Sequence, residues 1–311
     1  MSRAGGRLFV WSQYALPQHG LSRLVRAATR VRAPWLKNLL IRGFLSLFSV
    51  DMSEAMEPDP YRYATFNDFF TRALQPDARP IDLNPTAIVS PVDGVVSECG
   101  AIDQDLLLQA KGRHYSLSNL LAGQPWAKCF EGGIFATIYL APFNYHRIHM
   151  AVRGTLADTV YVPGRLFSVN MVTARYVPNL FARNERVLTL FETEFGRFAL
   201  VLVGALNVGS MATVWTGDLF PGVGTPSIDA PGVAVPGLTS SGARRVVRRI
   251  PSPAITLEKG AELGRFNMGS TVILLFEPRR AQWHPLLRAG SVVQMGRPIG
   301  VQDGPIGPQE A

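Results

Sequence analysis

Gly269 and Ser270 form the residue pair in this sequence with the clearest capacity for chemistry. Glycine has no side chain, so the carbonyl carbon of Gly269 is open to attack by the neighbouring serine hydroxyl. Such an attack replaces a peptide bond with an ester and can lead to a break in the chain. A break here separates residues 1–269 from residues 270–311. The pair alone does not establish self-cleavage, because Gly-Ser-Thr before the apolar run 272–276 is also an ordinary start of a β-strand.

Self-cleavage at Ser270 requires a base, since a serine hydroxyl is a poor nucleophile near neutral pH until its proton is removed. The candidates are the five histidines of the chain, His19, His114, His146, His149 and His284. His146 and His149 lie together in one short block. In a strand their side chains point to opposite faces and in a helix they share one face, and both alternatives stay open at this point. No third ligand at a suitable spacing accompanies them, so the sequence predicts no metal site.

The sequence from residue 87 onward predicts the β-rich part that positions these residues. Short apolar runs alternate with glycine and proline breaks, at 88–90, 94–97, 134–140, 187–192, 198–203 and 272–276. This rhythm is typical of a strand-rich domain with long loops, here spanning 87–311. Within it, residues 221–242 concentrate proline and glycine and are predicted to form a surface loop.

Residues 1–50 hold the excess positive charge of the chain. The net charge is +8, and these fifty residues contain eight lysines or arginines and no acidic residue. Between residues 21 and 31, apolar positions recur at helical spacing opposite a stripe of three arginines, Arg23, Arg26 and Arg30. A mostly apolar stretch at 35–50 is interrupted by charged residues and is too short to span a bilayer. The sequence therefore predicts amphipathic helices and no transmembrane segment.

Three interpretations of this basic segment stay open on periodicity alone. The helices could lie in a membrane interface, pack on the protein's own core with their arginines in water, or serve as a mitochondrial transit peptide. Nucleic-acid binding is not predicted, because neither this segment nor residues 244–249 interleave aromatic side chains with charge.

Residues 51–86 are rich in proline and aspartate and are predicted to form a connector containing one helix, near 65–73.

The two cysteines, Cys99 and Cys129, are isolated in sequence and are predicted to be reduced thiols. Reduced thiols fit a reducing compartment or a cytoplasmic membrane face. The predicted fold is therefore α+β, with N-terminal amphipathic helices followed by a β-rich, barrel-like or sandwich-like domain.

Several longer blocks resemble the signature blocks of one family. They are Phe69-Phe70-Thr71-Arg72, Ser90-Pro91-Val92-Asp93-Gly94, Tyr145-His146-Arg147-Ile148-His149-Met150, the segments 161–170 and 179–186, and Gly264-Arg265-Phe266. In this order they resemble the bacterial, pyruvoyl-dependent phosphatidylserine decarboxylases, which are made as proenzymes. The resemblance runs from near residue 8 to about residue 300. Two positions depart from the family pattern, Met268 where leucine is usual and Val92 where alanine is frequent, and both changes are apolar.

The resemblance implies roles for individual residues. Asp93, His149 and Ser270 correspond to a charge relay that drives cleavage between Gly269 and Ser270, and Ser270 then becomes a covalent pyruvoyl group. By the same resemblance, His146 is a candidate for assisting decarboxylation or proton transfer. The pyruvoyl group condenses with the amine of phosphatidylserine as a Schiff base, and loss of CO₂ gives phosphatidylethanolamine. It takes the place of pyridoxal phosphate, so neither that cofactor nor a metal is expected.

The resemblance also implies partners and a location. The large chain (1–269) and the small chain (270–311) are expected to stay together as a heterodimer, with further dimerisation left open. Because the substrate is a membrane lipid, residues 1–50 are expected to hold the enzyme on an anionic surface. The expected location is peripheral, on the cytoplasmic face of the cell (inner) membrane.

Two other functions stay open on the residues themselves. One is a serine hydrolase that uses Ser270, His149 and Asp93 without cutting the chain. It lacks the Gly-x-Ser-x-Gly elbow of that class, because no glycine stands two residues after Ser270. The other is a non-enzymatic peripheral membrane protein that acts through residues 1–50 alone.

Overall fold

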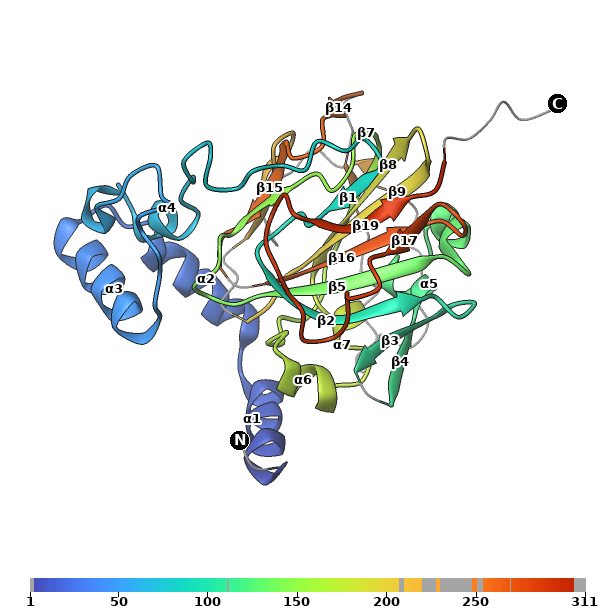
Figure 1. The fold of residues 1–311 in the computed structure, drawn as a ribbon. Coiled ribbons are helices and arrows are strands. Elements are labelled where there is room, and N and C mark those ends of the chain that lie inside the picture. Colours follow the sequence, from blue (N-terminus) through green and yellow to red (C-terminus); the bar gives the residue numbers. More distant parts are fainter. Residues whose placement is uncertain are drawn as a thin grey trace.

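The computed structural model describes residues 3–110, 112–206, 210–219, 228–229, 248–250, 254–268 and 270–304. The longest helices occupy the N-terminal part of the chain, and antiparallel sheets with a few short helices follow (Figure 1). The predicted α+β fold, with N-terminal helices followed by a β-rich part, is thereby confirmed. None of the helices in the described ranges is long and apolar enough to cross a membrane.

Three helices begin the chain, α1 (Arg3–Ala15), α2 (Gln18–Thr29) and α3 (Pro34–Leu47). The helix predicted from the apolar spacing at 21–31 corresponds to α2. Pro34 starts α3, because its fixed φ suits the first turn of a helix and its missing N–H is not needed there. The helical spacing of apolar residues in the sequence did not predict α1.

The connector contains a short 3₁₀ turn, η1 (Pro60–Arg62), and the predicted helix, α4 (Phe66–Phe70). The Thr65 hydroxyl caps α4 by accepting a hydrogen bond from the Asp68 amide at 3.1 Å. Helices α3 and α4 share a small aromatic core, separate from the main core, with Ile41, Phe66, Phe69 and Phe70 buried. We call residues 18–72, which contain α2, α3, η1 and α4, the helical lobe. In Figure 1, α3 and α4 lie together to one side of the sheets, and α2 lies between them and the sheets.

Ten strands form the main sheet within the described residues, and all its pairings are antiparallel. In spatial order they are β12 (Ile228–Asp229), β13 (Arg248–Ile250), β7 (Gly154–Val162), β8 (Arg186–Thr193), β9 (Gly196–Val203), β16 (Ser270–Phe276), β5 (Ile134–Leu140), β2 (Gly94–Ala101) and β18 (Val292–Val293), with β14 (Thr256–Leu257) also paired to β7. Within the described ranges this order is an open path. Every residue of β16 is buried, so this strand lies at the centre of the core.

Three smaller sheets complete the β-rich part. Their strands are β11 (Gly217–Leu219), β10 (Met211–Thr213), β15 (Glu262–Phe266) and β6 (Arg147–His149) in the first, β1 (Ala87–Val89), β19 (Pro298–Gln302) and β17 (Ala281–Trp283) in the second, and β3 (Leu106–Ala110) and β4 (Arg113–Ser116) in the third. Short helices lie between strands, namely α5 (Leu117–Leu120), η2 (Pro125–Phe130), α6 (Met171–Tyr176) and α7 (Leu180–Arg183). Helix α1 packs against α6, where the absence of a side chain at Gly6 allows Tyr176 to approach closely.

The apolar runs of the sequence correspond to β1, β2, β5, β8, β9 and β16. The loop predicted at 221–242 lies outside the described residues except for 228–229, which pair with β13. Cys99 and Cys129 are both free thiols, as predicted.

One end of the main sheet collects the predicted reactive segments. Ser270 begins β16 and pairs with Leu140 at the end of β5, while the next residue pairs with Val203 at the end of β9. Strand β2 starts at Gly94, directly after Asp93, and pairs with the same end of β5. Strand β6, which carries His149, lies beside β15, which leads toward Ser270. The fold therefore brings these segments to a common end of the sheet.

Candidate active site

Ser270 is fully buried, and its Oγ atom has no hydrogen-bond partner among the described residues. A buried hydroxyl without a partner typically costs about 1–3 kcal/mol, so native structures rarely leave one unpaired without a reason. The hydroxyl at the predicted cleavage position is thus kept dry and uncommitted. Ser270 also opens a β-strand, whereas the nucleophile of a serine hydrolase elbow stands between a strand and a helix.

The backbone just before Ser270 is strained. Met268 has a φ of 122°, in a region that residues with a side chain rarely adopt. Such a conformation costs on the order of 1–3 kcal/mol and persists only where surrounding contacts impose it. Gly269, the other residue of the predicted cleavage site, lies outside the described residues. The strain at Met268 is therefore placed one residue from the predicted scissile bond.

His149 lies in β6 and uses both ring nitrogens. Its Nδ1 lies 2.8 Å from the Gly260 carbonyl oxygen and its Nε2 lies 3.0 Å from the Tyr145 hydroxyl. A carbonyl oxygen can only accept, so Nδ1 carries the proton and Nε2 accepts from Tyr145. Burial lowers the pKa of His149 and raises that of Tyr145. The imidazole is therefore neutral near pH 7, in the state that a general base requires.

Asp93 is buried and bound by groups other than His149. The Arg79 guanidinium donates to both carboxylate oxygens, at 2.7 Å from Nη2 and 3.1 Å from Nε. The Met295 amide donates to Oδ1 at 2.8 Å. Arg79 also binds Glu54 at 2.8 Å, and burial of its side chain makes this a shielded network.

The structure brings the three predicted relay residues to one region but does not join them by hydrogen bonds. The backbone amide of His149 donates to the Pro91 carbonyl at 2.8 Å, which ties β6 to the loop that carries Asp93. Asp93 also acts on His149 electrostatically, as a minor influence that favours its protonated form. Among the described residues, no hydrogen bond links either residue to Ser270 Oγ.

His146 lies immediately before β6 and has different surroundings from His149. Its Nδ1 lies 2.8 Å from the Asn144 carbonyl oxygen, so Nδ1 carries the proton and Nε2 has a lone pair. That Nε2 is buried and has no partner among the described residues. The ring packs on Phe70 of α4, with centroids 4.1 Å apart. Burial lowers the pKa of His146 to about 3, so the residue is a neutral acceptor over the physiological range.

Glu185 adds a buried carboxyl group at the same end of the sheet. It precedes β8, and its carbonyl oxygen accepts from the Gly204 amide just beyond β9. Its side chain is only 3% exposed, and Oε2 lacks a hydrogen-bond partner within the described ranges. Burial raises the pKa of Glu185 to about 7, although the Tyr161 hydroxyl opposes this shift.

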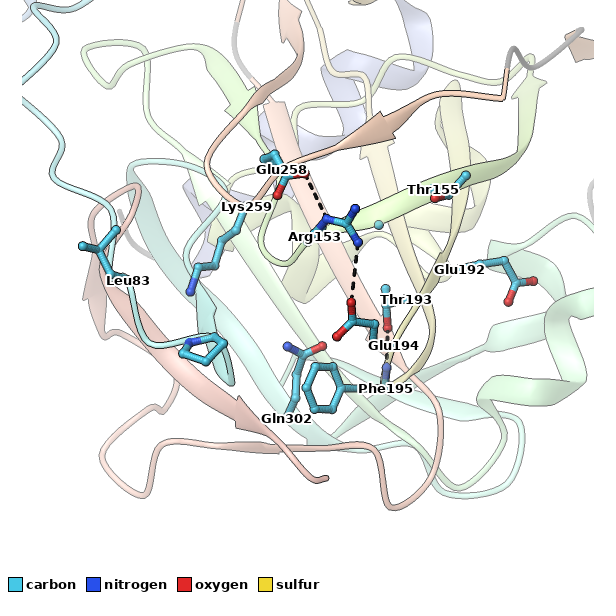
Figure 2. A pocket seen from close by; sticks show the side chains of 12 residues that line it. Leu83, Arg153, Thr155, Glu192, Thr193, Glu194, Phe195, Glu258, Lys259 and Gln302 are labelled. Carbon is cyan, nitrogen blue, oxygen red and sulfur yellow. Dashed lines mark hydrogen bonds and ion pairs between the residues drawn. The ribbon is translucent and has the colours of Figure 1, made fainter. Parts of the chain in front are cut away.

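A cavity of about 500 Å³ lies away from these groups. Its lining includes Lys259, the neighbour of the Gly260 that binds His149, but none of the predicted site residues. Figure 2 shows Arg153 between Glu258 and Glu194, with which it forms ion pairs of 2.9 and 3.6 Å. The cavity is therefore not the reaction site.

Sequence reasoning missed the groups that contact the predicted residues. Tyr145 stands in the same block as both histidines, so its position was a usable signal. Arg79 lies in the connector, where nothing in the local sequence indicates a role. Their importance arises from contacts between distant parts of the chain.

Comparison with known proteins shows the family of this chain. A family model described as phosphatidylserine decarboxylase matches residues 66–301, and a second, described as PSD, matches residues 8–49. A phosphatidylserine decarboxylase proenzyme from Bordetella bronchiseptica is 50% identical over 301 residues, covering 95% of this chain and 94% of the relative. One from Pseudomonas fluorescens is 50% identical over 296 residues, covering 95% of this chain and 97% of the relative. The chain therefore belongs to the phosphatidylserine decarboxylase family.

Proposed function

We propose that this chain is a proenzyme that cuts itself between Gly269 and Ser270 and then converts phosphatidylserine to phosphatidylethanolamine and CO₂. The single observation that carries the cleavage step is the buried Ser270 hydroxyl, which has no partner among the described residues, next to the strained backbone of Met268. A nucleophile kept out of water and a backbone held away from its relaxed conformation both favour attack on the preceding carbonyl.

In the proposed cleavage step, His149 accepts the Ser270 proton and Asp93 stabilises the resulting imidazolium. The neutral Nε2 lone pair suits His149 for this role. In the structure that lone pair accepts from Tyr145, and Asp93 is bound to Arg79. Formation of the relay therefore requires His149 to exchange its Tyr145 hydrogen bond for one with Ser270. After that exchange, Asp93 stabilises the His149 imidazolium electrostatically, either from its present position or after moving closer to the ring.

His146 is proposed to handle a proton during turnover. Its buried Nε2 has a lone pair and no partner among the described residues, and the Phe70 ring shields it from water. Because the ring is neutral, its Nε2 is ready to accept a hydrogen bond from a group that arrives in the site.

The cofactor of the family is a pyruvoyl group, and the site has features that suit one. Ser270 pairs with Leu140 of β5 and the next residue also pairs with Val203 of β9, which fixes the backbone at this position, and the buried His146 Nε2 has no partner among the described residues. When formed, a pyruvoyl group at position 270 supplies an electron sink for loss of CO₂ from an amino acid headgroup. The chain's own contribution is to hold that position rigidly and exclude water from it.

After the proposed cut, the two chains stay together because β16 is the centre of the sheet. The small chain (270–311) contributes β16, and the large chain contributes β9 on one side and β5 on the other. Strands β18 and β19 of the small chain add further pairings, to β2 and β1 of the large chain. We infer a heterodimer that does not dissociate without unfolding.

The membrane contact is proposed to lie on the N-terminal helices. Large apolar side chains are exposed there, including Trp11, Leu24, Trp35, Leu39 and Leu47, and the segment has no acidic residue. Exposed apolar groups with basic neighbours suit the interface of an anionic bilayer. We therefore propose a peripheral location on the cytoplasmic face of the inner membrane.

We also propose that the chain divides into a membrane-associating segment (1–50), a connector (51–86) and a catalytic domain (87–311).

Part of the basic stripe has a different role from the one its helical pattern suggests. Arg26 of α2 and Arg30, the C-cap residue of that helix, bind Asp218 of β11 at 3.4 and 2.5 Å. These arginines contact the β-rich part of the protein. We therefore assign membrane contact mainly to the exposed apolar side chains and the remaining basic residues.

Denaturing electrophoresis together with a decarboxylation assay tests the proposed function. The wild-type protein should separate into a large chain and a fragment of roughly 4–5 kDa, scaled from its length, and should release CO₂ from phosphatidylserine in detergent micelles. Ser270→Ala should leave one chain of 34.0 kDa without activity. Hydrolysis of phosphatidylserine by uncut wild-type protein, without release of CO₂, would favour the serine hydrolase alternative.

A further inference from the structure

We infer that helix α2 positions the self-cleavage segment, with Arg30 acting through Asp218 and Asn267 on the backbone before the scissile bond. This inference rests on the proposed self-cleavage at Gly269–Ser270. It assigns to a helix of the N-terminal segment a role in maturation that is separate from membrane contact.

Asn267 is the centre of the contacts. Its side chain is buried, and its amide nitrogen donates to Ser210 Oγ at 2.6 Å and to Asp218 Oδ1 at 3.2 Å. Its backbone amide donates to the Ser210 carbonyl at 2.9 Å. Both the side chain and the backbone of the residue before Met268 are therefore fixed.

Arg30, the C-cap residue at the end of α2, supports this arrangement. Its Nη2 donates to Asp218 Oδ2 at 2.5 Å and to Ser210 Oγ at 3.2 Å, so it contacts both acceptors of the Asn267 side chain. Arg26 adds a longer contact to the same carboxylate, at 3.4 Å. A guanidinium that binds a carboxylate and a hydroxyl together fixes the direction of both.

The rest of the helical lobe also contacts Asn267 and Met268. Asn67 of α4 donates to Asn267 Oδ1 at 3.0 Å, which uses the remaining polar atom of that side chain. Met268 packs against the aromatic core formed by α3 and α4. The lobe thus contacts two consecutive residues that lead to the scissile bond.

These contacts explain how the unusual backbone of Met268 can persist. A non-glycine residue at a φ of 122° relaxes unless its neighbours are held on both sides. On the N-terminal side, Asn267 is held by Ser210, Asp218 and Asn67. On the C-terminal side, Ser270 is fixed by pairing in β16. Loosening the first support allows Met268 to relax and moves the carbonyl away from the serine hydroxyl, which slows attack.

The test measures the rate at which newly made precursor is cut, in cell-free synthesis with detergent and without substrate lipid. Arg30→Met and Asn267→Ala should each slow the appearance of the small fragment by at least about tenfold, since hydrogen bonds to charged and buried partners are lost. Arg30→Lys keeps the charge beside Asp218 and should restore much of the rate.

Arg62→Met is the matched control. Arg62 lies in the same lobe and also pairs with carboxylates, Glu57 and Asp59, but its side chain is 73% exposed and does not contact Asn267. It should be cut at the wild-type rate. Thermal unfolding of Arg30→Met in a Ser270→Ala background should show a folded precursor, so that slow cutting is not caused by misfolding.

The outcomes separate this inference from the proposed function. If Ser270→Ala stays uncut while Arg30→Met and Asn267→Ala are cut at the wild-type rate, α2 has no positioning role and only the inference fails. The inference also fails, by itself, if Arg30→Lys is as slow as Arg30→Met. If Ser270→Ala is cut normally, the proposed self-cleavage itself fails.

Discussion

The Arg79 guanidinium holds the Asp93 carboxylate through both of its oxygens, at 2.7 and 3.1 Å, and both side chains are nearly shielded from water. This pairing occupies the carboxylate that the proposed relay needs. It also means that the two charges depend on each other for stability, because an unpaired buried charge is strongly unfavourable.

Arg79→Met should therefore destabilise the precursor by about 3–5 kcal/mol, since it leaves Asp93 buried without its counter-charge. The measurement is urea unfolding of the variant in the Ser270→Ala background, which keeps the chain intact. Arg62→Met, which removes an exposed ion pair, should change the unfolding free energy by at most about 1 kcal/mol. Equal stability of the Arg79 variant and its parent would contradict the buried pairing.

Tyr145→Phe removes the hydroxyl that occupies Nε2 of His149. If this hydrogen bond must be exchanged before His149 accepts the Ser270 proton, its loss should speed cleavage by roughly fivefold, the equivalent of one ordinary hydrogen bond. The rate is measured by electrophoresis of newly made precursor. Slower cleavage would show that Tyr145 assists the reaction and does not compete with it.

The two histidines should separate maturation from turnover. His149→Ala and Asp93→Asn should leave mostly uncut precursor, because each removes a member of the proposed relay. His146→Ala should be cut but should decarboxylate slowly, because its buried lone pair is assigned to the substrate reaction. Normal processing in both relay variants would refute the relay, and unchanged turnover in His146→Ala would remove His146 from the mechanism.

Glu185 should make the protein less stable as the pH rises. Its pKa is raised from 4.5 to about 7 by burial, so the folded state binds the proton more tightly than the unfolded state. The stabilisation is complete below about pH 4.5 and is lost as the pH rises through about 7, with a total of about 3 kcal/mol. The measurement compares unfolding free energies of the parent and Glu185→Gln precursors between about pH 5 and pH 8.

The glutamine variant should lack most of this pH-dependent loss. His146 contributes a loss at the acid end, since its folded pKa of about 3 lies below the ordinary value of 6.5, but that contribution is common to both proteins. Parallel curves for the two proteins would show that Glu185 is not protonated at neutral pH in the folded state.

The main strands and the α2 helix could be predicted from sequence because their signals are local. The apolar run of β16 is buried along its whole length, and the periodicity at 21–31 is the apolar face of α2. Whether His146 and His149 share a face could not be decided from spacing. In the structure His149 ends β6, His146 lies immediately before that strand, and the two side chains have separate surroundings. The register of strands fixes that difference, and register depends on distant partners.

The contacts of the site were beyond local patterns for the same reason. Arg79 and Asp93 belong to different segments, and Arg30 meets Asp218 across 188 positions of sequence. The arginine stripe of α2 predicted a surface in contact with water or lipid, because helical periodicity reports only which residues share a face. Two of its three arginines instead bind a carboxylate of β11. The remaining exposed arginine, Arg23, is the part of the stripe that follows the simple pattern.

Mass spectrometry of the intact, purified protein tests self-cleavage at Ser270 most directly. The expected result is two masses, one for residues 1–269 and one for residues 270–311, with the smaller chain lighter than a serine-initiated fragment by the mass of one ammonia molecule. A folded protein that decarboxylates phosphatidylserine while giving a single mass for the whole chain would contradict it.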